Sequence, residues 1–396
     1  MKAKSQVKSD STARIEKIIK KGAKIANPAA IEIGPEVDVD RISGDGVVIY
    51  AGCKIFGADT LILPGVKLGY EAPVTVDDCQ IGPDVELEGG YFNQAVFLDN
   101  VKCALGSHVR EATILEEQAR IAHTVALKHT ILLPFVTLGS LINFCDCLMA
   151  GGTSRKNHSE VGSSYIHFNF TPNQDKATAS LIGDVPRGVM LNQRPIFLGG
   201  QGGLVGPCRL GFGITVAAGS IIRKDEPRSG RLIFGGAGKG GNVAYEPGKL
   251  RMAQKIIGNN INYIANLVAL KHWYQQVRGL FVARRFPAAL LNGLNQNVSL
   301  AIAERINRLE AVYSKKSEAG WSELKGFLGS SPSDPADAES MESFLETVHK
   351  GIAAGGKDYI GVIQGLAPAD SAKGTRWLQG IVDHITAQAR KMMPDN

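Results

Sequence analysis

Small aliphatic residues recur at a spacing of six positions along most of the stretch from residue 31 to residue 222. The residues that keep this spacing, in separate runs, are Ile33, Val39, Ile49, Ile55, Leu61, Leu68, Val74, Ile81, Leu87, Leu115, Ile121, Leu127, Leu133, Leu210, Val216 and Ile222. A period of six matches neither an amphipathic helix nor an alternating strand. It is the spacing of hexapeptide repeats, in which three hexads form one coil and the aliphatic side chains stack inside. The sequence therefore predicts a parallel β-helix over residues 29–226.

Polar segments interrupt the hexads. The segment 150–158 is glycine-led and basic, and the segment 170–176 is polar. We expect both to leave the coil as loops, and loops on a rigid scaffold often carry functional residues. Most of the 46 glycines precede residue 245, which suits coil corners that need a positive φ.

The two ends of the chain differ in character from the hexads. Residues 1–28 are expected to form a tail, disordered over the first dozen residues, and a helix over about 13–20 that ends at Gly22 and covers the open end of the coils. Residues 227–248 are predicted to be a glycine-rich connection. Over residues 249–396 apolar residues recur at steps of three and four, which predicts helices at about 250–273, 286–316, 338–352 and 375–392. The fold class is thus mainly β with a C-terminal helical domain, in which no catalytic residue is expected.

Composition excludes several classes of protein. The net charge of +6 comes without a basic stripe of interleaved aromatics, so we expect no nucleic-acid partner, whereas a small acidic substrate fits. The six cysteines suggest neither disulfides nor zinc and are expected to fill the coil interior of a reduced, cytoplasmic protein. His123 and His129 are one hexad apart, not one coil, so no metal site is expected. We also expect neither a signal peptide nor a membrane span.

Three groups of residues carry a resemblance to a known family. His129 lies nine residues before Leu138-Gly139, and Asn169-Phe170 precedes a loop that ends at Lys176 and leads to Leu181-Ile182-Gly183-Asp184. Val216-Ala217-Ala218-Gly219-Ser220 is followed by Arg223. Over about half of its length the chain resembles the left-handed β-helix acetyltransferases. It is most similar to the acetyltransferase half of the bifunctional N-acetylglucosamine-1-phosphate uridyltransferase/glucosamine-1-phosphate acetyltransferases.

The resemblance implies a left-handed coil, a homotrimer with its sites in clefts between neighbouring β-helices, and acetyl-coenzyme A as co-substrate. The acceptor would be an amino-sugar phosphate or a nucleotide sugar. We expect no uridylyl transfer, because the chain contains no glycine-rich nucleotide loop of the kind that opens a uridyltransferase domain.

The same resemblance suggests a role for each site residue. The general base would be His129 or, because the interval from His129 to Asn169 is about one coil longer than in the family, His158. Asn169 and Phe170 would bind the sugar, and Arg120 and Lys176 its phosphate. The backbone amides of Ala217, Ala218 and Gly219, with the side chains of Arg223 and Lys224, would bind the coenzyme.

Each of these residues also has a purely structural interpretation. His129 would then be a corner residue, His158 and Lys176 solvated loop residues, and Asn169 an asparagine that hydrogen-bonds its stacked neighbours. His167 is expected to project outward and to make a structural hydrogen bond. The alternative function is a non-catalytic nucleotide-sugar-binding or trimeric scaffold protein whose helical domain binds a partner.

Overall fold

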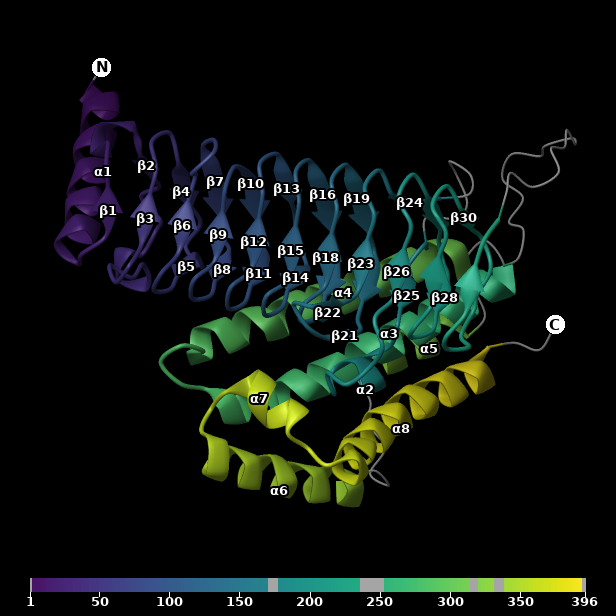
Figure 1. Cartoon of the computed structure of the whole chain (residues 1–396). Helices are drawn as coiled ribbons and strands as arrows, with labels where there is room; N and C mark the ends of the chain where they lie inside the picture. Colours follow the sequence, from purple (N-terminus) through teal and green to yellow (C-terminus); the bar gives the residue numbers. More distant parts are fainter. Residues whose placement is uncertain (1, 170–176, 236–252, 314–319, 331–337, 394–396) are drawn as a thin grey trace, which may run out of the picture. The chain divides into compact units, whose positions relative to one another are not determined.

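The structure, a computed structural model, describes residues 2–169, 177–235, 253–313, 320–330 and 338–393. The chain forms a parallel β-solenoid followed by a helical region, which confirms the predicted fold class (Figure 1). Three long parallel sheets, here called A, B and C, contain eleven, ten and eight strands. Each coil passes from sheet A through sheet B to sheet C.

Most strands are only two to four residues long. Sheet A consists of β1 (Lys24–Ile25), β3 (Val48–Ile49), β6 (Lys67–Leu68), β9 (Glu86–Leu87), β12 (Lys102–Cys103), β15 (Arg120–Ile121), β18 (Thr137–Leu138), β23 (Glu160–Val161), β26 (Phe197–Leu198), β29 (Thr215–Val216) and β31 (Leu232–Ile233). Sheet B consists of β2 (Glu32–Ile33), β4 (Lys54–Phe56), β7 (Val74–Asp77), β10 (Gly90–Asn93), β13 (Ser107–Val109), β16 (Val125–Lys128), β19 (Ile142–Cys145), β24 (Ile166–Phe168), β27 (Gly203–Val205) and β30 (Ile221–Ile222). Sheet C consists of β5 (Leu61–Ile62), β8 (Gln80–Ile81), β11 (Ala95–Phe97), β14 (Thr113–Leu115), β17 (Ile131–Leu132), β20 (Cys147–Met149), β25 (Ser180–Ile182) and β28 (Arg209–Leu210).

The hexad aliphatics form the solenoid core. All sixteen residues of the repeat keep 7% or less of their surface exposed. In sheet A the registers Ile49↔Leu68, Leu68↔Leu87 and Leu87↔Cys103 put one such side chain directly above the next. Five of the six cysteines are buried and all six are free thiols, so the expectation that they fill the coil interior is wrong only for the half-buried Cys145.

Sheet C differs from the other two sheets in the burial of its outer face. Strands of sheets A and B alternate buried and more exposed residues, as in β7 and β16. Strands of sheet C are buried on both faces, as in β11 and β14. Continuous apolar runs such as Ala95–Leu98 are typical of strands buried on both faces.

By compactness the chain divides into two units. The first comprises residues 1–144 and 282–297, and the second comprises 145–281 and 298–396. The last solenoid strand, β31 (Leu232–Ile233), follows the predicted boundary at residue 226, and residue 248 lies outside the described residues. Compactness divides both the solenoid and the helical region.

The first unit begins with helix α1 (Lys2–Lys20). The expected disorder of the first dozen residues is wrong, because the helix already begins at Lys2 in a stretch without glycine or proline. Its buried Ile15 and Ile18 and the hydrogen bond from Arg14 Nη2 to Ile33 O (3.2 Å) pack it on the first coil. Gly22 ends the helical segment at a φ of 109°.

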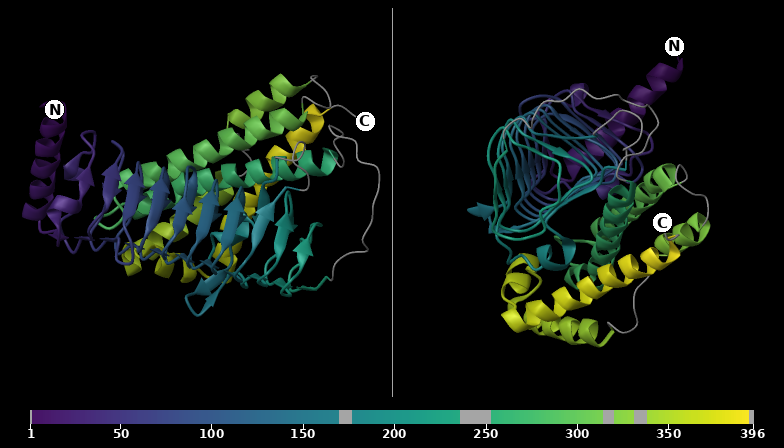
Figure 2. Two further views of the ribbon diagram at one scale, coloured as in Figure 1. Left: turned by 90° about the horizontal axis from the view of Figure 1, so that it is seen from above. Right: turned by 90° about the vertical axis from the view of Figure 1, so that its right-hand side faces the viewer.

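The second unit contains most of the helical region. The helices beyond the N-terminal one are α2 (Val185–Gly188), α3 (Ala253–Gln276), α4 (Ala288–Tyr313), α5 (Trp321–Gly329), α6 (Ala338–Gly355), α7 (Tyr359–Gln364) and α8 (Pro368–Met392). The short 3-10 helix η3 (Arg278–Phe281) lies in the second unit, and η1 (Pro28–Ala30) and η2 (Val39–Arg41) lie in the first. Helices α3, α6 and α8 pack together through Trp273, Phe344 and Trp377, whose neighbouring rings are 5.9 and 6.3 Å apart (Figure 2). The four predicted helices are present, α8 begins earlier than expected, and α2, α5 and α7 were not predicted.

One predicted excursion from the coil is a β-hairpin. Strands β21 (Gly152–Ser154) and β22 (Asn157–His158) pair antiparallel, so the chain leaves the solenoid here as expected. The other predicted loop, 170–176, lies outside the described residues. Among the residues that the structure describes, no helix is both long and apolar enough to span a membrane.

Candidate functional site

The turn from sheet B into sheet C, here called the B–C corner, carries the first candidate base. On consecutive coils of the first unit this corner places Asp78, Gln94, Ala112 and His129 at φ values of 49°, 47°, 53° and 47°. A left-handed backbone is uncommon for residues with a side chain and is often a sign of functional strain. Since four successive coils share it, the conformation of His129 follows from the coil and gives no separate evidence of catalysis.

The surroundings of His129 are more informative than its backbone. Its side chain is 9% exposed, and its Nε2 lies 3.9 Å from Oε1 of Glu111, which is too far for a hydrogen bond. The same Glu111 oxygen lies 2.7 Å from Nζ of Lys128. The histidine thus lies beside a carboxylate.

Glu111 is held in its ionised form. Partial burial acts to raise its pKa, but the hydrogen bond from Lys128 and the nearby positive charges outweigh burial, and the pKa of Glu111 is lowered overall. Glu111 was not among the residues predicted for the site. It lies three hexads before His129, so the coil period places the two residues at the same corner of adjacent coils.

Arg120 lies elsewhere on the same unit. It is an exposed residue of β15 in sheet A, in register with Lys102 and Thr137. The B–C corner lies opposite sheet A in the three-sided coil. A single copy of the chain therefore does not bring Arg120 to His129.

The second candidate base, His158, belongs to the second unit. It ends strand β22 of the hairpin, and its Nε2 lies 3.8 Å from Oε2 of Glu160. With 19% of its side chain exposed it is more accessible than His129. The hairpin is anchored by the hydrogen bond from Gln364 Nε2 to Thr153 O (2.6 Å).

The residues expected to bind the sugar are only partly described. Asn169 is exposed and follows β24, whereas Phe170 and Lys176 lie outside the described residues. His167 makes the expected structural hydrogen bond, 2.9 Å between its Nε2 and Ser180 Oγ, but the expectation that it projects outward is wrong. In β24 Ile166 points outward, and His167 is 5% exposed, so burial lowers the pKa of His167 to about 4.

The residues expected to bind the coenzyme lie at two corners of one coil. Ala217, Ala218 and Gly219 form the turn from β29 to β30, between sheets A and B, and Ala218 and Gly219 are exposed. The amides of Ala217 and Gly219 already donate to Ile233 O and Gly200 O, both at 2.9 Å. A coenzyme would have to compete for these two donors.

Arg223 and Lys224 have exposed side chains at the B–C corner, directly after β30. Their side chains can provide positive charge for a phosphate without breaking the coil hydrogen bonds. Of the predicted coenzyme contacts, these two side chains are the most accessible.

In the second unit, helices make hydrogen bonds to the B–C corner. Arg305 of α4 is 2% exposed at its side chain, and its Nη2 lies 2.6 Å from Oδ1 of Asp146, which directly follows β19. From α3, Asn260 Nδ2 donates to Ala177 O (2.7 Å) and Asn259 Nδ2 to Asp225 Oδ1 (3.2 Å). These contacts were not predicted, although two adjacent asparagines inside an apolar helix are a sequence signal that could have indicated them.

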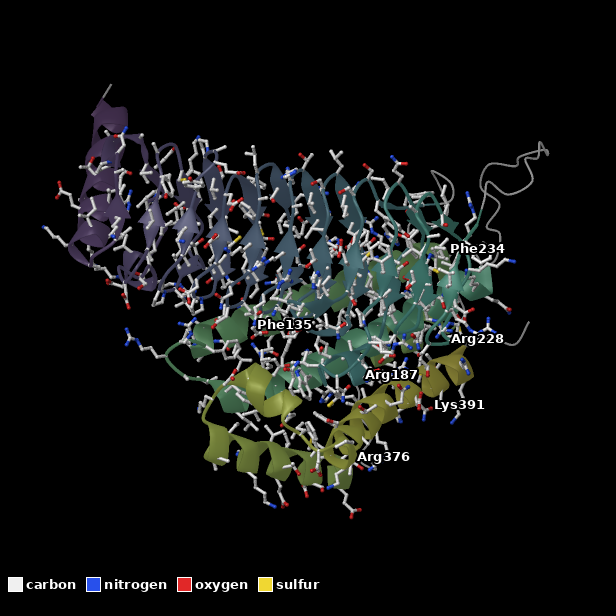
Figure 3. All side chains as sticks on the ribbon, viewed as in Figure 1. Phe135, Arg187, Arg228, Phe234, Arg376 and Lys391 are labelled. Carbon is white, nitrogen blue, oxygen red and sulfur yellow. The ribbon has the colours of Figure 1, made fainter. Side chains whose placement is uncertain are left out.

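The motif 181–184 also has a structural role. Asp184 caps helix α2 by accepting a hydrogen bond from Arg187 N (3.0 Å), and its carboxylate pairs with the Arg187 side chain. Arg187, labelled in Figure 3, also lies over the ring of Phe212, 5.0 Å from its centroid. Asp184 therefore stabilises a turn.

Within the described ranges no group of three or more His, Cys, Asp or Glu side chains could hold a metal ion.

Comparison with known proteins gives a partial match. No protein-family model matches the chain. It is 26% identical over 214 residues to the bifunctional protein GlmU of Thermotoga maritima, a match that covers 54% of this chain and 42% of that protein. GlmU of Acinetobacter baumannii is 28% identical over 207 residues, with 51% of this chain and 36% of that protein covered. The chain thus spans about two fifths of the length of the curated relatives it matches.

A solved structure, the polySia specific acetyltransferase NeuO, aligns with 59% of this chain and 89% of its own at 10% identity. Its TM-score is 0.17, so this alignment gives no support to a shared fold. The hexads, the parallel solenoid and the sequence likeness to the GlmU proteins nevertheless agree with one another. Over about half of its length the chain is similar in sequence to the GlmU proteins.

Proposed function

We propose that this protein is an acyltransferase that moves an acetyl group from acetyl-coenzyme A to the amino group of an amino-sugar phosphate or nucleotide sugar. The observation that carries the proposal is His129 beside the ionised Glu111, at a corner of a solenoid related in sequence to the GlmU proteins. A histidine that lies beside a carboxylate suits the role of a general base.

In the proposed reaction, His129 Nε2 takes a proton from the attacking amine. The amine nitrogen attacks the carbonyl carbon of the thioester, the C–N bond forms, and the C–S bond breaks. The thiol of coenzyme A leaves with a proton returned by the imidazolium. Glu111 stabilises the imidazolium, and its bond to Lys128 keeps the carboxylate in place.

The other predicted residues would bind the two substrates. Arg223 and Lys224 provide exposed cations for the phosphates of the coenzyme at the B–C corner, and β30 separates them from the turn Ala217–Gly219. Asn169, with Phe170 and Lys176, would bind the sugar and its phosphate. Since Arg120 and His129 lie on opposite sides of one coil, a site that uses both needs a second copy, which supports a homotrimer.

The proposal is tested by measuring thiol release from acetyl-coenzyme A with glucosamine 1-phosphate and with UDP-glucosamine. We expect His129→Ala to lower turnover about 10²–10⁴-fold, the usual contribution of a general base. His158→Ala tests the rival base, and His108→Ala is a matched control, because His108 is an exposed histidine on the outer face of sheet B. Loss of turnover only in His158→Ala would identify His158 of the hairpin as the base. Absence of turnover with every amino sugar would contradict the proposed acyltransferase activity.

A second candidate function is a non-catalytic nucleotide-sugar-binding or trimeric scaffold protein. The small exposed fraction of His129 and the occupied amides of Ala217 and Gly219 favour it. This function predicts that UDP-N-acetylglucosamine binds in calorimetry and is recovered unchanged after incubation with acetyl-coenzyme A. Thiol release that depends on His129 would exclude it.

A further inference from the structure

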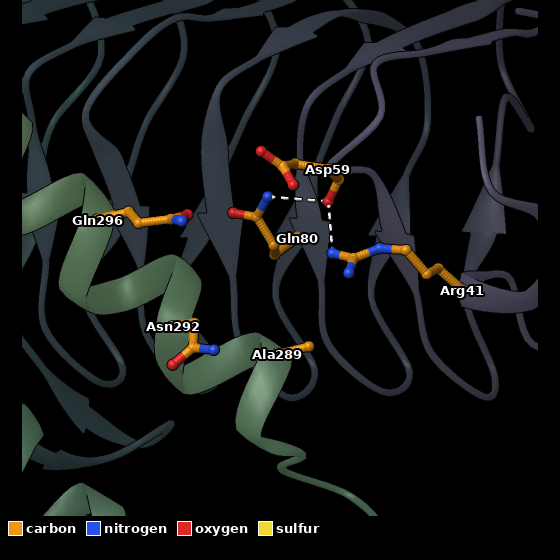
Figure 4. Close-up of a pocket in the computed structure, with 6 residues that line it drawn as sticks. All are labelled: Arg41, Asp59, Gln80, Ala289, Asn292 and Gln296. Carbon is orange, nitrogen blue, oxygen red and sulfur yellow. Dashed lines mark hydrogen bonds between the residues drawn. The ribbon is translucent and has the colours of Figure 1, made fainter. Parts of the chain in front are cut away.

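A small pocket of about 110 Å³ lies within the first unit, away from the B–C corner residue His129. Its lining residues are Arg41, Asp59, Gln80, Ala289, Asn292 and Gln296 (Figure 4). We propose that this pocket binds hydroxyl groups of a neutral sugar. The proposal does not depend on the acyltransferase activity.

The sequence position of Gln80 is the first observation. In sheet C the registers Gln80↔Val96, Val96↔Ile114 and Ile114↔Ile131 form one row of side chains. The three aliphatic members are fully buried, and Gln80 is 4% exposed. On its other side Gln80 is in register with the buried Leu61, so a polar side chain interrupts an apolar row. Burial of a polar group is costly unless it is hydrogen-bonded.

The hydrogen bonds of Gln80 fix the direction of its amide. Nε2 donates to Asp59 O (3.1 Å) and Asp78 O (3.3 Å), and two carbonyl acceptors leave only this orientation. Oε1 is buried and has no hydrogen-bond partner among the described residues. Figure 4 shows it on the side that faces Gln296. A buried acceptor of this kind calls for a donor from a ligand or water.

Helix α4 leaves space for this acceptor. A Cβ added to Gly293 would lie 2.7 Å from Gln80 Oε1 and 3.0 Å from its Cγ. Glycine inside a helix is destabilising by roughly 1 kcal/mol relative to alanine. At Gly293 helix α4 therefore passes close to this buried oxygen, at a position where a side chain would displace the Gln80 amide.

The remaining side chains point to a neutral ligand with hydroxyl groups. Asn292 and Gln296 are exposed and one helical turn apart on α4, and each carboxamide can both donate and accept. Arg41 Nη2 donates to Asp59 O (2.9 Å), and these two residues contribute one charge of each sign. The lining is neutral overall, so it offers no preference for phosphate. A hydroxyl group can both donate and accept, and so matches the hydrogen-bond donors and the acceptors of the lining.

The size of the pocket limits what binds. Ligand pockets for drug-sized molecules are several hundred Å³, so a pocket of about 110 Å³ holds one edge of a single sugar ring. No aromatic residue is among the lining side chains, and we expect weak binding in the millimolar range, about −4 kcal/mol.

Saturation-transfer NMR on the full chain tests the proposal, with D-glucose and N-acetyl-D-glucosamine as probes and inorganic phosphate as a ³¹P-observed comparison. We expect the sugars to bind with Kd in the millimolar range and phosphate not to compete. Asn292→Ala and Gln296→Ala, both at exposed positions, should each weaken sugar binding roughly threefold to tenfold. Gly293→Ala should abolish it by displacing the Gln80 amide.

Asn295→Ala is the matched control, since Asn295 lies on the same helix and donates to Leu291 O (3.0 Å) without lining the pocket. It should bind sugars as the wild type does. Absence of sugar binding, competition by phosphate, or equal losses in Asn295→Ala and Gln296→Ala would overturn the proposal. A pocket filled only by water would give the first of these results.

Discussion

The B–C corner is built in two ways, one in each compact unit. In the first unit Lys128 and Glu111 pair at 2.7 Å with 26% and 33% of their side chains exposed. In the second unit Arg305 and Asp146 pair at 2.6 Å with 2% and 13% exposed. The backbone is alike, since His129 and Asp146 both have left-handed φ values, of 47° and 62°.

The difference lies in what the helices contribute. Arg305, Asn259 and Asn260 bring hydrogen-bonding groups to the corner in the second unit, and the corner becomes part of a buried polar network. The charges around His129 in the first unit come from the coils themselves. The same turn of the solenoid can thus form either a structural contact or a partly accessible site, depending on residues far away in the sequence.

The largest effect that would test this contrast is expected at Arg305. Replacing it by methionine leaves Asp146 buried without its cation, and removing one partner of a buried ion pair typically costs about 3–5 kcal/mol. Urea unfolding followed by tryptophan fluorescence measures the loss. The double variant Asp146→Asn/Arg305→Met should recover part of it, because no buried charge is then left unpaired.

Arg308→Ala is the control for that experiment. Arg308 pairs with Glu304 at 2.7 Å, but its side chain is 43% exposed, so we expect a change of about 0.5 kcal/mol or less. Equal destabilisation by the two arginine substitutions would show that the corner of the second unit is no more buried than an ordinary surface.

A second effect, of about 3 kcal/mol, is expected from pH in the second unit. Burial lowers the pKa of His167 from 6.5 to about 4. The nearby charge of Asp146 acts to raise this pKa, and the charge of Arg305 acts to lower it further. Below pH 6.5 the unfolded chain binds a proton that the folded chain excludes, so the free energy of unfolding falls as pH decreases from 6.5 to 4. The contribution of His167 is fully present above pH 6.5.

His167→Gln checks this assignment, because glutamine can keep a hydrogen bond to Ser180 without titrating. Urea unfolding at pH 7, 6 and 5 should give a smaller decrease in unfolding free energy for the variant than for the wild type. Parallel curves for the two proteins would mean that another group causes the acid sensitivity.

Apart from the Arg308 control, the smallest effect is expected at Lys128 in the first unit. Lys128→Met removes the hydrogen bond that lowers the pKa of Glu111, so this pKa should rise towards its ordinary value. A lowered carboxylate pKa stabilises the fold above the ordinary value of 4.5 and ceases to do so as pH falls through the lowered pKa. For a pair this exposed we expect a loss of at most about 1 kcal/mol at pH 7 and none at pH 2. A loss as large as that of Arg305→Met would remove the contrast between the two corners.

The sequence predicted the solenoid well because the aliphatic position in each hexad identifies the residue that is buried. The aliphatics from Ile33 to Ile222 pack on equivalent residues of the next coil, so a local pattern is sufficient to specify the fold. The α3 and α4 helices followed from their apolar spacing. Helix α2 was missed because it is a single turn set by the cap at Asp184.

The candidate site was less predictable. His129 and its neighbour Glu111 are related by the coil period, so the sequence contains that pair. His167 was predicted to project outward, but in strand β24 Ile166 is the exposed residue and His167 is buried. The pairing of Arg305 with Asp146 joins positions more than 150 residues apart, and no spacing in the sequence indicates it.

By itself, then, the sequence determined the architecture, because stacking of like residues at a fixed period is a local rule repeated along the chain. Only the tertiary structure decided which polar residues of that architecture are buried and which stay accessible. The reason is that desolvation depends on every group packed around a charge, including helices from distant parts of the chain.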